Sequence, residues 1–172
     1  MKQKELWWNF FKCGTAGWCL EILFTSVESI FTQDWRLMGR TSLLMFPIYG
    51  LGALLGPVGR RIDRWLEEGI WDDLESTEGI RASGRELALR HGMIDMVLIF
   101  CAEYLFGFCM QQIGICPWDY HGRPTNISGL IRLDFAPLWF FTGLLFEEIT
   151  WRGSAQSLFG RNTQKKNHSP GL

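Results

Sequence analysis

The sequence predicts an all-α membrane protein with about four transmembrane helices, arranged as two helical hairpins with an amphipathic cytoplasmic helix between them. Two features of the composition favour a bilayer environment. The 172 residues include 9 Trp and 13 Phe, and Trp in particular gathers at membrane interfaces, while Phe suits lipid-facing and packed surfaces. The charged residues are also clustered, which leaves long apolar segments between them.

Four segments are close to the length that crosses a hydrocarbon core, which takes ~20 helical residues. These segments are residues 8–31, 42–58, 93–115 and 130–151. The second segment is short and contains several Gly and Pro residues, including Pro47, so we expect it to be kinked. Each of the other three carries carboxylates.

The distribution of Lys and Arg indicates the orientation of these segments. With the N-terminus inside, 13 of the 17 Lys and Arg residues fall on the cytoplasmic side. The outer loops hold only Arg36, Arg40, Arg123 and Arg132. This positive-inside bias predicts a multi-pass protein of the cell membrane with both termini in the cytoplasm. The net charge of −1 gives no argument for a nucleic-acid partner.

A charged region at residues 59–91 separates the two predicted hairpins. At its start Val58, just before the region, and Ile62, Trp65 and Leu66 recur at helical spacing, opposite charged side chains. This pattern predicts either an amphipathic helix on the inner membrane surface or a helix packed on the bundle. We expect residues 1–152 to form one polytopic transmembrane domain and the polar tail, residues 153–172, to be disordered.

Glu21 and Glu103 are the residues that point most strongly to function. Each lies near the middle of a predicted span, where a charged side chain costs ~2.5–3.5 kcal/mol on insertion scales. Glu28 lies seven residues after Glu21 and therefore on the same helical face. The functional interpretation is an acidic path or cation site, and the structural one is a protonated Glu bonded to a neighbouring helix. Glu147 and Glu148 lie near the inner end of the fourth span, where an interfacial position explains them.

A weak internal repeat places Glu21 and Glu103 at matching positions of the two hairpins. The acids precede Trp35 and Trp118 by 14 and 15 residues, and each pair is followed by a Gly-containing loop and a span with a Pro. Two hairpins in the same orientation would resemble the parallel repeats of some transporters. Coincidence is the alternative.

The outer side of the predicted domain holds the other candidate binding residues. Arg40, at the mouth of the second span, is a possible counter-charge or an interfacial anchor. In the loop at residues 116–129, Trp118 and Tyr120 suit the interface. Asp119 and His121 could bind a metal or cap a turn, and one such pair does not make a metal site by itself. Asn126 begins an Asn-Ile-Ser sequon.

Several catalytic and cofactor-binding classes are not indicated. The sequence has no P-loop, no HExxH, no GxSxG and no Rossmann glycine pattern. We therefore expect no cofactor and name no catalytic residues, while the question of a metal stays open.

Several short motifs resemble the "putative ABC-transporter permease" family of CmpB type, over about residues 11–150. That family is similar to the animal transmembrane-protein-229 family. The motifs are Gly17-Trp18-Cys19-Leu20-Glu21, Pro47-Ile48-Tyr49-Gly50-Leu51-Gly52, Glu103-Tyr104, Cys116-Pro117-Trp118-Asp119-Tyr120 and Asn126-Ile127-Ser128-Gly129-Leu130-Ile131. The resemblance implies a polytopic membrane protein with a transporter label. The Asn-Arg-Gly motif of bacterial members is kept only in part, around Arg40.

Three functions follow as hypotheses. The first is a transporter or channel subunit that moves a small ion or solute past intramembrane carboxylates, with candidate residues Glu21, Glu28, Arg40, Glu103, Trp118, Asp119, Tyr120 and Asn126. The second is a non-catalytic membrane scaffold or accessory subunit. The third is a membrane enzyme that acts on a lipid-like substrate through carboxylates with Asp119 or His121. The expected partners are the lipid bilayer, further copies of the chain and another membrane protein.

Overall fold

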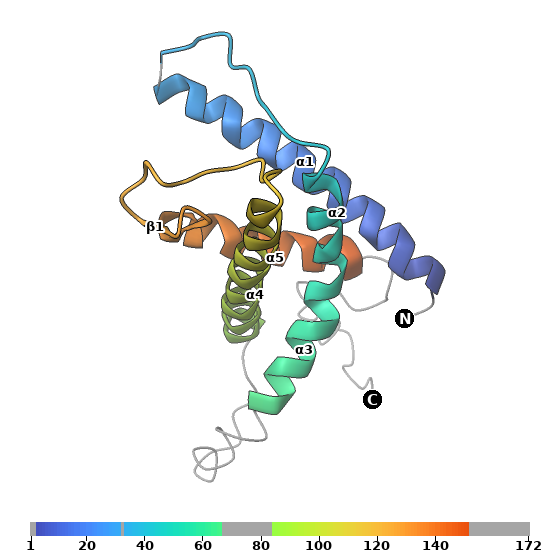
Figure 1. The fold of residues 1–172 in the computed structure, drawn as a ribbon. Helices are drawn as coiled ribbons and strands as arrows, with labels where there is room; N and C mark the ends of the chain where they lie inside the picture. The colour runs from blue at the N-terminus through green and yellow to red at the C-terminus, as the bar shows by residue number, and fades with distance from the viewer. Residues whose placement is uncertain (1–2, 32, 67–83, 152–172) are drawn as a thin grey trace, which may run out of the picture.

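The computed structural model describes residues 3–31, 33–66 and 84–151, and these are mostly helical (Figure 1). The elements in chain order are α1 (Gln3–Phe31), α2 (Met45–Gly50), the 3₁₀-helix η1 (Leu51–Leu54), α3 (Leu55–Leu66), α4 (Gly84–Gln112), β1 (Asn126–Ile127), β2 (Ile131–Arg132), the 3₁₀-helix η4 (Leu133–Phe135) and α5 (Ala136–Trp151). The helical character predicted from the sequence is confirmed. The tail at residues 153–172 lies outside the described residues.

Among the described helices, α4 is the one that is long and apolar enough to cross a membrane, and the prediction of four spans in two hairpins is not supported. The physical reasons differ between segments. Charged and polar side chains interrupt α1. The second segment is divided into α2, η1 and α3. At ~1.5 Å per residue, the 16 residues of α5 extend only about 24 Å, which is less than the ~30 Å of a hydrocarbon core.

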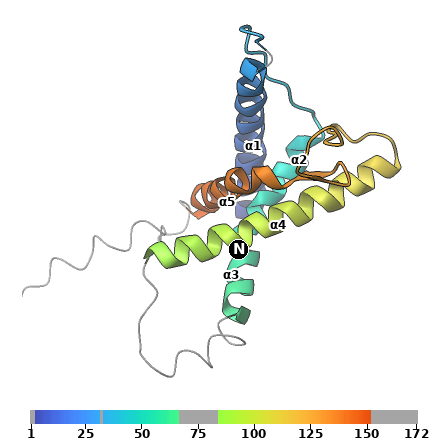
Figure 2. The ribbon, with the colours of Figure 1, turned by 90° about the vertical axis from the view of Figure 1, so that its left-hand side faces the viewer.

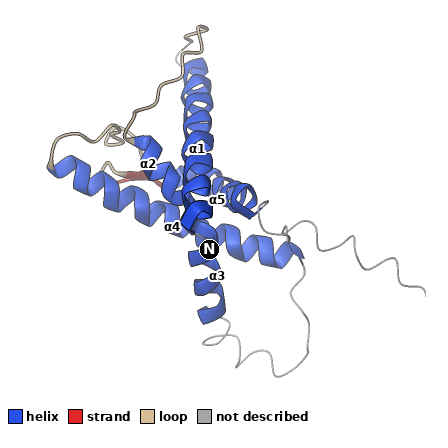
Figure 3. Ribbon diagram, turned by 90° about the vertical axis from the view of Figure 1, so that its right-hand side faces the viewer, coloured by secondary structure: helices blue, strands red, loops and turns tan. Residues whose placement is uncertain are grey.

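The helices cross one another steeply and do not run side by side. Viewed with α1 upright, α4 runs across it, and α3 continues downward from α2 (Figure 2). α1 packs mainly on α2, and α4 packs mainly on α5. The long loop that follows α4 carries the short antiparallel pair β1–β2 and returns the chain to α5 (Figure 3).

Glycines allow the close approach of helices at these crossings. A Cβ atom at Gly17 of α1 would overlap the ring of Tyr49 on α2, and one at Gly92 of α4 would overlap the ring of Phe140 on α5. In the second segment, Gly50 faces Phe10 and Gly52 faces Phe146. These glycines of the second segment are therefore used for packing within the chain.

A small apolar core contrasts with a large apolar surface. The buried core cluster consists of Cys13, Ala53, Leu55 and Phe146. Many large apolar side chains are exposed instead, over α1, α4 and α5 alike, among them Leu23, Phe31, Val97, Leu105, Phe108 and Phe141. An exposed apolar surface of this extent needs a partner other than water. Lipid is the partner that fits a chain with a membrane-length helix.

The predicted amphipathic helix proves to be the second half of α3, which is continuous with the segment before it and ends at Leu66. Its polar side is not simply solvated, since Asp63 is buried and pairs with Arg90 of α4 at 2.7 Å. This contact agrees with the interpretation of a helix packed on the bundle. Residues 67–83 of the predicted region lie outside the described residues.

Candidate functional site

A cavity of about 670 Å³ opens between the C-terminal half of α1, α2, the C-terminal half of α4, α5 and the loop before α5. The segments predicted to lie on the outer side meet here. Seven of the eight candidate binding residues line this cavity: Glu21, Glu28, Arg40, Glu103, Trp118, Asp119 and Tyr120. The eighth, Asn126, is not among the lining residues.

Glu21 is held in the wall of the cavity by neutral hydrogen-bond donors. The loop after α1 runs back along the helix, because Trp18 Nε1 donates to the carbonyl oxygen of Ser42 at 3.0 Å. The loop thereby brings Thr41 to Glu21, and the Thr41 hydroxyl donates to Glu21 Oε2 at 2.8 Å. The ring of Tyr49, packed on Gly17 one turn before Glu21, brings its hydroxyl close to the same carboxylate.

The carboxylate of Glu103, on α4, is likewise held by neutral hydrogen-bond donors. Trp139 of α5 donates from Nε1 to Glu103 Oε2 at 3.1 Å. The hydroxyl of Tyr120, on the loop before β1, lies close to the same carboxylate. Tyr49 and Tyr120 each interact electrostatically with both Glu21 and Glu103, which places the two acids around one space. Within the described residues, neither acid forms an ion pair: their hydrogen-bond donors are neutral, and Arg132 adds an electrostatic attraction to Glu103.

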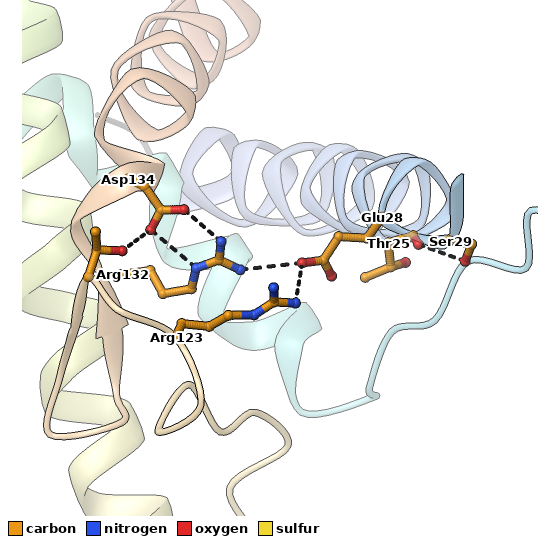
Figure 4. A network of polar contacts seen from close by, with 7 residues as sticks. Thr25, Glu28, Ser29, Arg123, Arg132 and Asp134 are labelled. Carbon is orange, nitrogen blue, oxygen red and sulfur yellow. Dashed lines mark hydrogen bonds and ion pairs between the residues drawn. The ribbon is translucent and has the colours of Figure 1, made fainter. Parts of the chain in front are cut away.

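The rim of the cavity carries basic residues that are already paired (Figure 4). Glu28 Oε1 accepts from Arg123 at 3.1 Å and from Arg132 at 3.3 Å. Arg132 also pairs with Asp134 at 2.6 Å and lies over the ring of Phe135, 4.1 Å from its centroid. The Thr125 hydroxyl donates a further hydrogen bond to Asp134. This network fixes the loop between α4 and α5 to α1 and pairs both arginines with acids.

Arg40, predicted as a counter-charge, is exposed at the mouth of the cavity. Its backbone N–H donates to Thr25 Oγ1 at 2.8 Å, and the same hydroxyl donates to the Arg40 carbonyl oxygen at 3.1 Å. This contact anchors the loop that presents Thr41. It places Arg40 beside the cavity without pairing it with Glu21.

Side-chain hydrogen bonds fix the turns of the loop at residues 116–129, between α4 and β2. Trp118 Nε1 donates to the carbonyl oxygen of Leu130 at 2.9 Å. Asp119 accepts from the backbone N–H of His121, and this contact, with the His121 side chain as a second donor, lowers the pKa of the Asp119 carboxyl. Asn126 accepts from the backbone N–H of Gly129, whose φ of +68° favours glycine. Asp119 with His121 therefore caps a turn, and Asn126 closes the next one.

Metal binding finds no support in the part of the chain that the structure describes. No group of three or more His, Cys, Asp or Glu side chains there could hold a metal ion. Asp119 and His121 contact each other in the turn, and the possibility of a metal there stays a prediction.

A second polar group, away from the cavity, was missed by sequence reasoning. The buried polar cluster consists of Asp63 of α3, His91 and Asp95 of α4, and Glu147 of α5. Their side chains are almost fully buried, with Asp95 0% and Glu147 1% exposed. His91 Nδ1 lies 3.0 Å from both oxygens of Glu147, and His91 Nε2 lies 3.8 Å from Asp63 Oδ2.

This cluster corrects the interfacial explanation of Glu147. The carboxylate points to His91 in the interior and lies beside Gly56 and Gly59 of α3. One signal was available in the sequence: Asp95 is an acid inside an apolar run of the third predicted span, as Glu103 is. The residues around Asp95 could not be predicted, because the shortest contact in the cluster, His91 to Glu147, joins residues that are 56 positions apart in the sequence.

The fold and the cavity define a mostly helical protein with one membrane-length helix among the described residues and an aromatic-walled pocket that holds two carboxylates. The chain belongs to the family described as "Putative ABC-transporter type IV", whose sequence profile matches residues 8–166. The family resemblance read from the short motifs is thereby confirmed. No solved structure matches the chain.

Proposed function

We propose that this protein is a transporter subunit that binds a small organic cation between Glu21 and Glu103. The family supports a transporter-type protein. The observation that carries the proposal is the shared cavity, in which both carboxylates have neutral donors and no ion-pair partner among the described residues.

The chemistry of the walls favours an organic cation over other solutes. Two carboxylates held in a partly buried cavity attract positive charge, and aromatic faces stabilise a cation further. Tyr49, Trp118, Tyr120 and Trp139 supply aromatic rings in the lining. The positive charges of Arg123 and Arg132 at the rim would repel a cation. This repulsion is reduced because the two arginines pair with Glu28 and Asp134.

The membrane arrangement is part of the same proposal. Segments 8–31, 42–58, 93–115 and 130–151 lie in the bilayer with both termini in the cytoplasm, so the cavity opens to the outer side. The positive-inside bias and the exposed apolar side chains of α1, α4 and α5 support this arrangement. Further copies of the chain or another membrane protein complete the path, since one chain of this size encloses little space. We further propose that this family is related to the animal transmembrane-protein-229 family.

The two alternatives fit the cavity less well. A scaffold has no need for a polar cavity that holds two acids without ion-pair partners. An enzyme would use Asp119 or His121 as its reactive group, and Asp119 is bound to His121 in an exposed turn. His121 is not among the cavity-lining residues.

The test is uptake of a labelled organic cation, tetraethylammonium, into liposomes that contain the purified full-length protein. We expect uptake by the wild type and its loss in Glu21→Gln and in Glu103→Gln, because Gln keeps a hydrogen-bond acceptor for Thr41 or Trp139 but removes the charge. Glu86→Gln is the matched control, since Glu86 is an exposed acid on α4 outside the cavity lining. Unfolding of both cavity variants would instead support the structural interpretation of these acids.

A further inference from the structure

The buried polar cluster has a charge pattern that the cavity does not explain. It combines three carboxylates, on Asp63, Asp95 and Glu147, with His91. Two guanidinium groups face it: Arg90 pairs with Asp63 at 2.7 Å, and Arg60 approaches Glu147 and Asp95 from α3. With His91 neutral and all three acids ionised, the group carries one net negative charge. One added proton balances it.

His91 is placed to hold protons on both ring nitrogens. Nδ1 lies 3.0 Å from both Glu147 oxygens, so it carries a hydrogen that Glu147 accepts. Nε2 faces Asp63 Oδ2 at 3.8 Å, which is an ion-pair distance if the ring is charged. An imidazole between two carboxylates is most stable as imidazolium.

Asp95 is the second place for a proton. It is fully buried, and neither of its oxygens accepts a hydrogen bond within the described residues. Its carboxyl lies against Gly59 of α3 and Gly143 of α5. At Gly59, Asp95 Oδ1 and Glu147 Oε1 both lie close to the position that a Cβ atom would occupy. An ionised carboxylate without hydrogen bonds is very costly in such a place, and protonation removes most of that cost. Because no group among the described residues could hold a metal ion, a proton fits better than a metal cation.

We propose that the buried polar cluster is a binding site for one exchangeable proton, shared between Asp95 and His91. The site is distinct from the cavity, since none of the four cluster residues is among the cavity-lining residues. It lies on the same two helices, about one turn from the lining residues Leu98 of α4 and Thr142 of α5. The charged groups that face it are Arg60 and Asp63 from α3, Arg90 from α4 and Glu147 from α5.

Infrared difference spectroscopy of the full-length protein in lipid nanodiscs, between acidic and alkaline pH, tests this site. We expect a carbonyl band of a protonated carboxylic acid that disappears as the pH rises and that is lost in Asp95→Asn. Asn is neutral and has nearly the same shape, so the fold should survive. Glu86→Gln, an exposed acid on the same helix, should leave the band unchanged.

Isotope labelling provides the same test without a substitution. Incorporation of carboxyl-¹³C aspartate should shift the band, whereas carboxyl-¹³C glutamate should not. Absence of any protonated-carboxyl band would overturn the proposal, as would a band that shifts only with labelled glutamate. A band that persists in a folded Asp95→Asn protein would also overturn it. If Asp95→Asn fails to fold, the shift of the band with labelled aspartate in the wild-type protein still tests the proposal.

Discussion

At the scale of single residues, glycines determine how closely the helices approach. Gly17 has no space for a side chain because Tyr49 of α2 occupies it, and Tyr49 in turn lies close to Glu21. The position of a candidate binding residue thus depends on the absence of a Cβ atom one turn away.

We predict that Gly17→Ala destabilises the protein by about 1–3 kcal/mol, the usual cost of forcing extra atoms into a packed contact. Thermal unfolding in detergent micelles measures this. Gly84→Ala is the control, because a Cβ atom at Gly84 meets nothing within 4 Å. Equal stability of the two variants would show that α1 and α2 do not make this contact.

The ion pairs at the cavity rim predict a small stabilising role for Asp134, which pairs with Arg132 at 2.6 Å. Because the Asp134 side chain is 42% exposed, we expect Asp134→Asn to lower the free energy of unfolding by only about 0.5–1 kcal/mol. Unfolding of the wild type and the variant in detergent micelles measures this difference, and equal stability of the two would contradict the pairing.

At the scale of elements, α3 is held to the rest of the fold by a buried ion pair as well as by apolar packing. Asp63 is buried on α3, and Arg90 and His91 reach it from α4. Removal of one partner of such a pair leaves the other charge uncompensated.

We therefore predict that Asp63→Ala lowers the free energy of unfolding by about 3 kcal/mol. Denaturation by SDS in mixed micelles is the appropriate measurement. Arg61→Ala on the exposed side of the same helix should change the stability by less than about 0.5 kcal/mol. If the two substitutions have equal effects, α3 is not anchored through Asp63.

The sequence predicted the elements better than their packing. Apolar length and composition located α1 and α4, and Pro47 with its neighbouring glycines indicated the break in the second segment. The steep crossings were not predictable, because they depend on which aromatic ring meets which glycine, as with Gly92 and Phe140. The cavity acids Glu21 and Glu103 were found because an acid in an apolar run stands out. Glu147 was misplaced, since its partner His91 is distant in the sequence.

At the scale of the whole molecule, the cavity and the buried polar cluster lie next to each other along the middle of α4. Glu103 and Asp95 are eight residues apart, which corresponds to about 12 Å along the helix. In the proposed membrane orientation, the cavity opens outward and the cluster lies towards the cytoplasm.

Cysteine labelling in intact cells tests this orientation. In a background with the five native cysteines replaced, a membrane-impermeant maleimide should react with Gly122→Cys on the outer loop. Glu86→Cys, near the start of α4, should react only after the cells are permeabilised. Reaction of both positions in intact cells would contradict the orientation, as would labelling of Glu86→Cys alone.

The central claim is that Glu21 and Glu103 form one binding site for an organic cation, and equilibrium binding of labelled tetraethylammonium to the purified protein tests it most directly. We predict saturable binding to the wild type that weakens at least about tenfold, roughly 1.4 kcal/mol, in either single Gln variant. The double variant should lose little more than a single one, because both carboxylates contact the same ligand. Unchanged binding in the double variant, with Glu86→Gln as the control, would contradict the account.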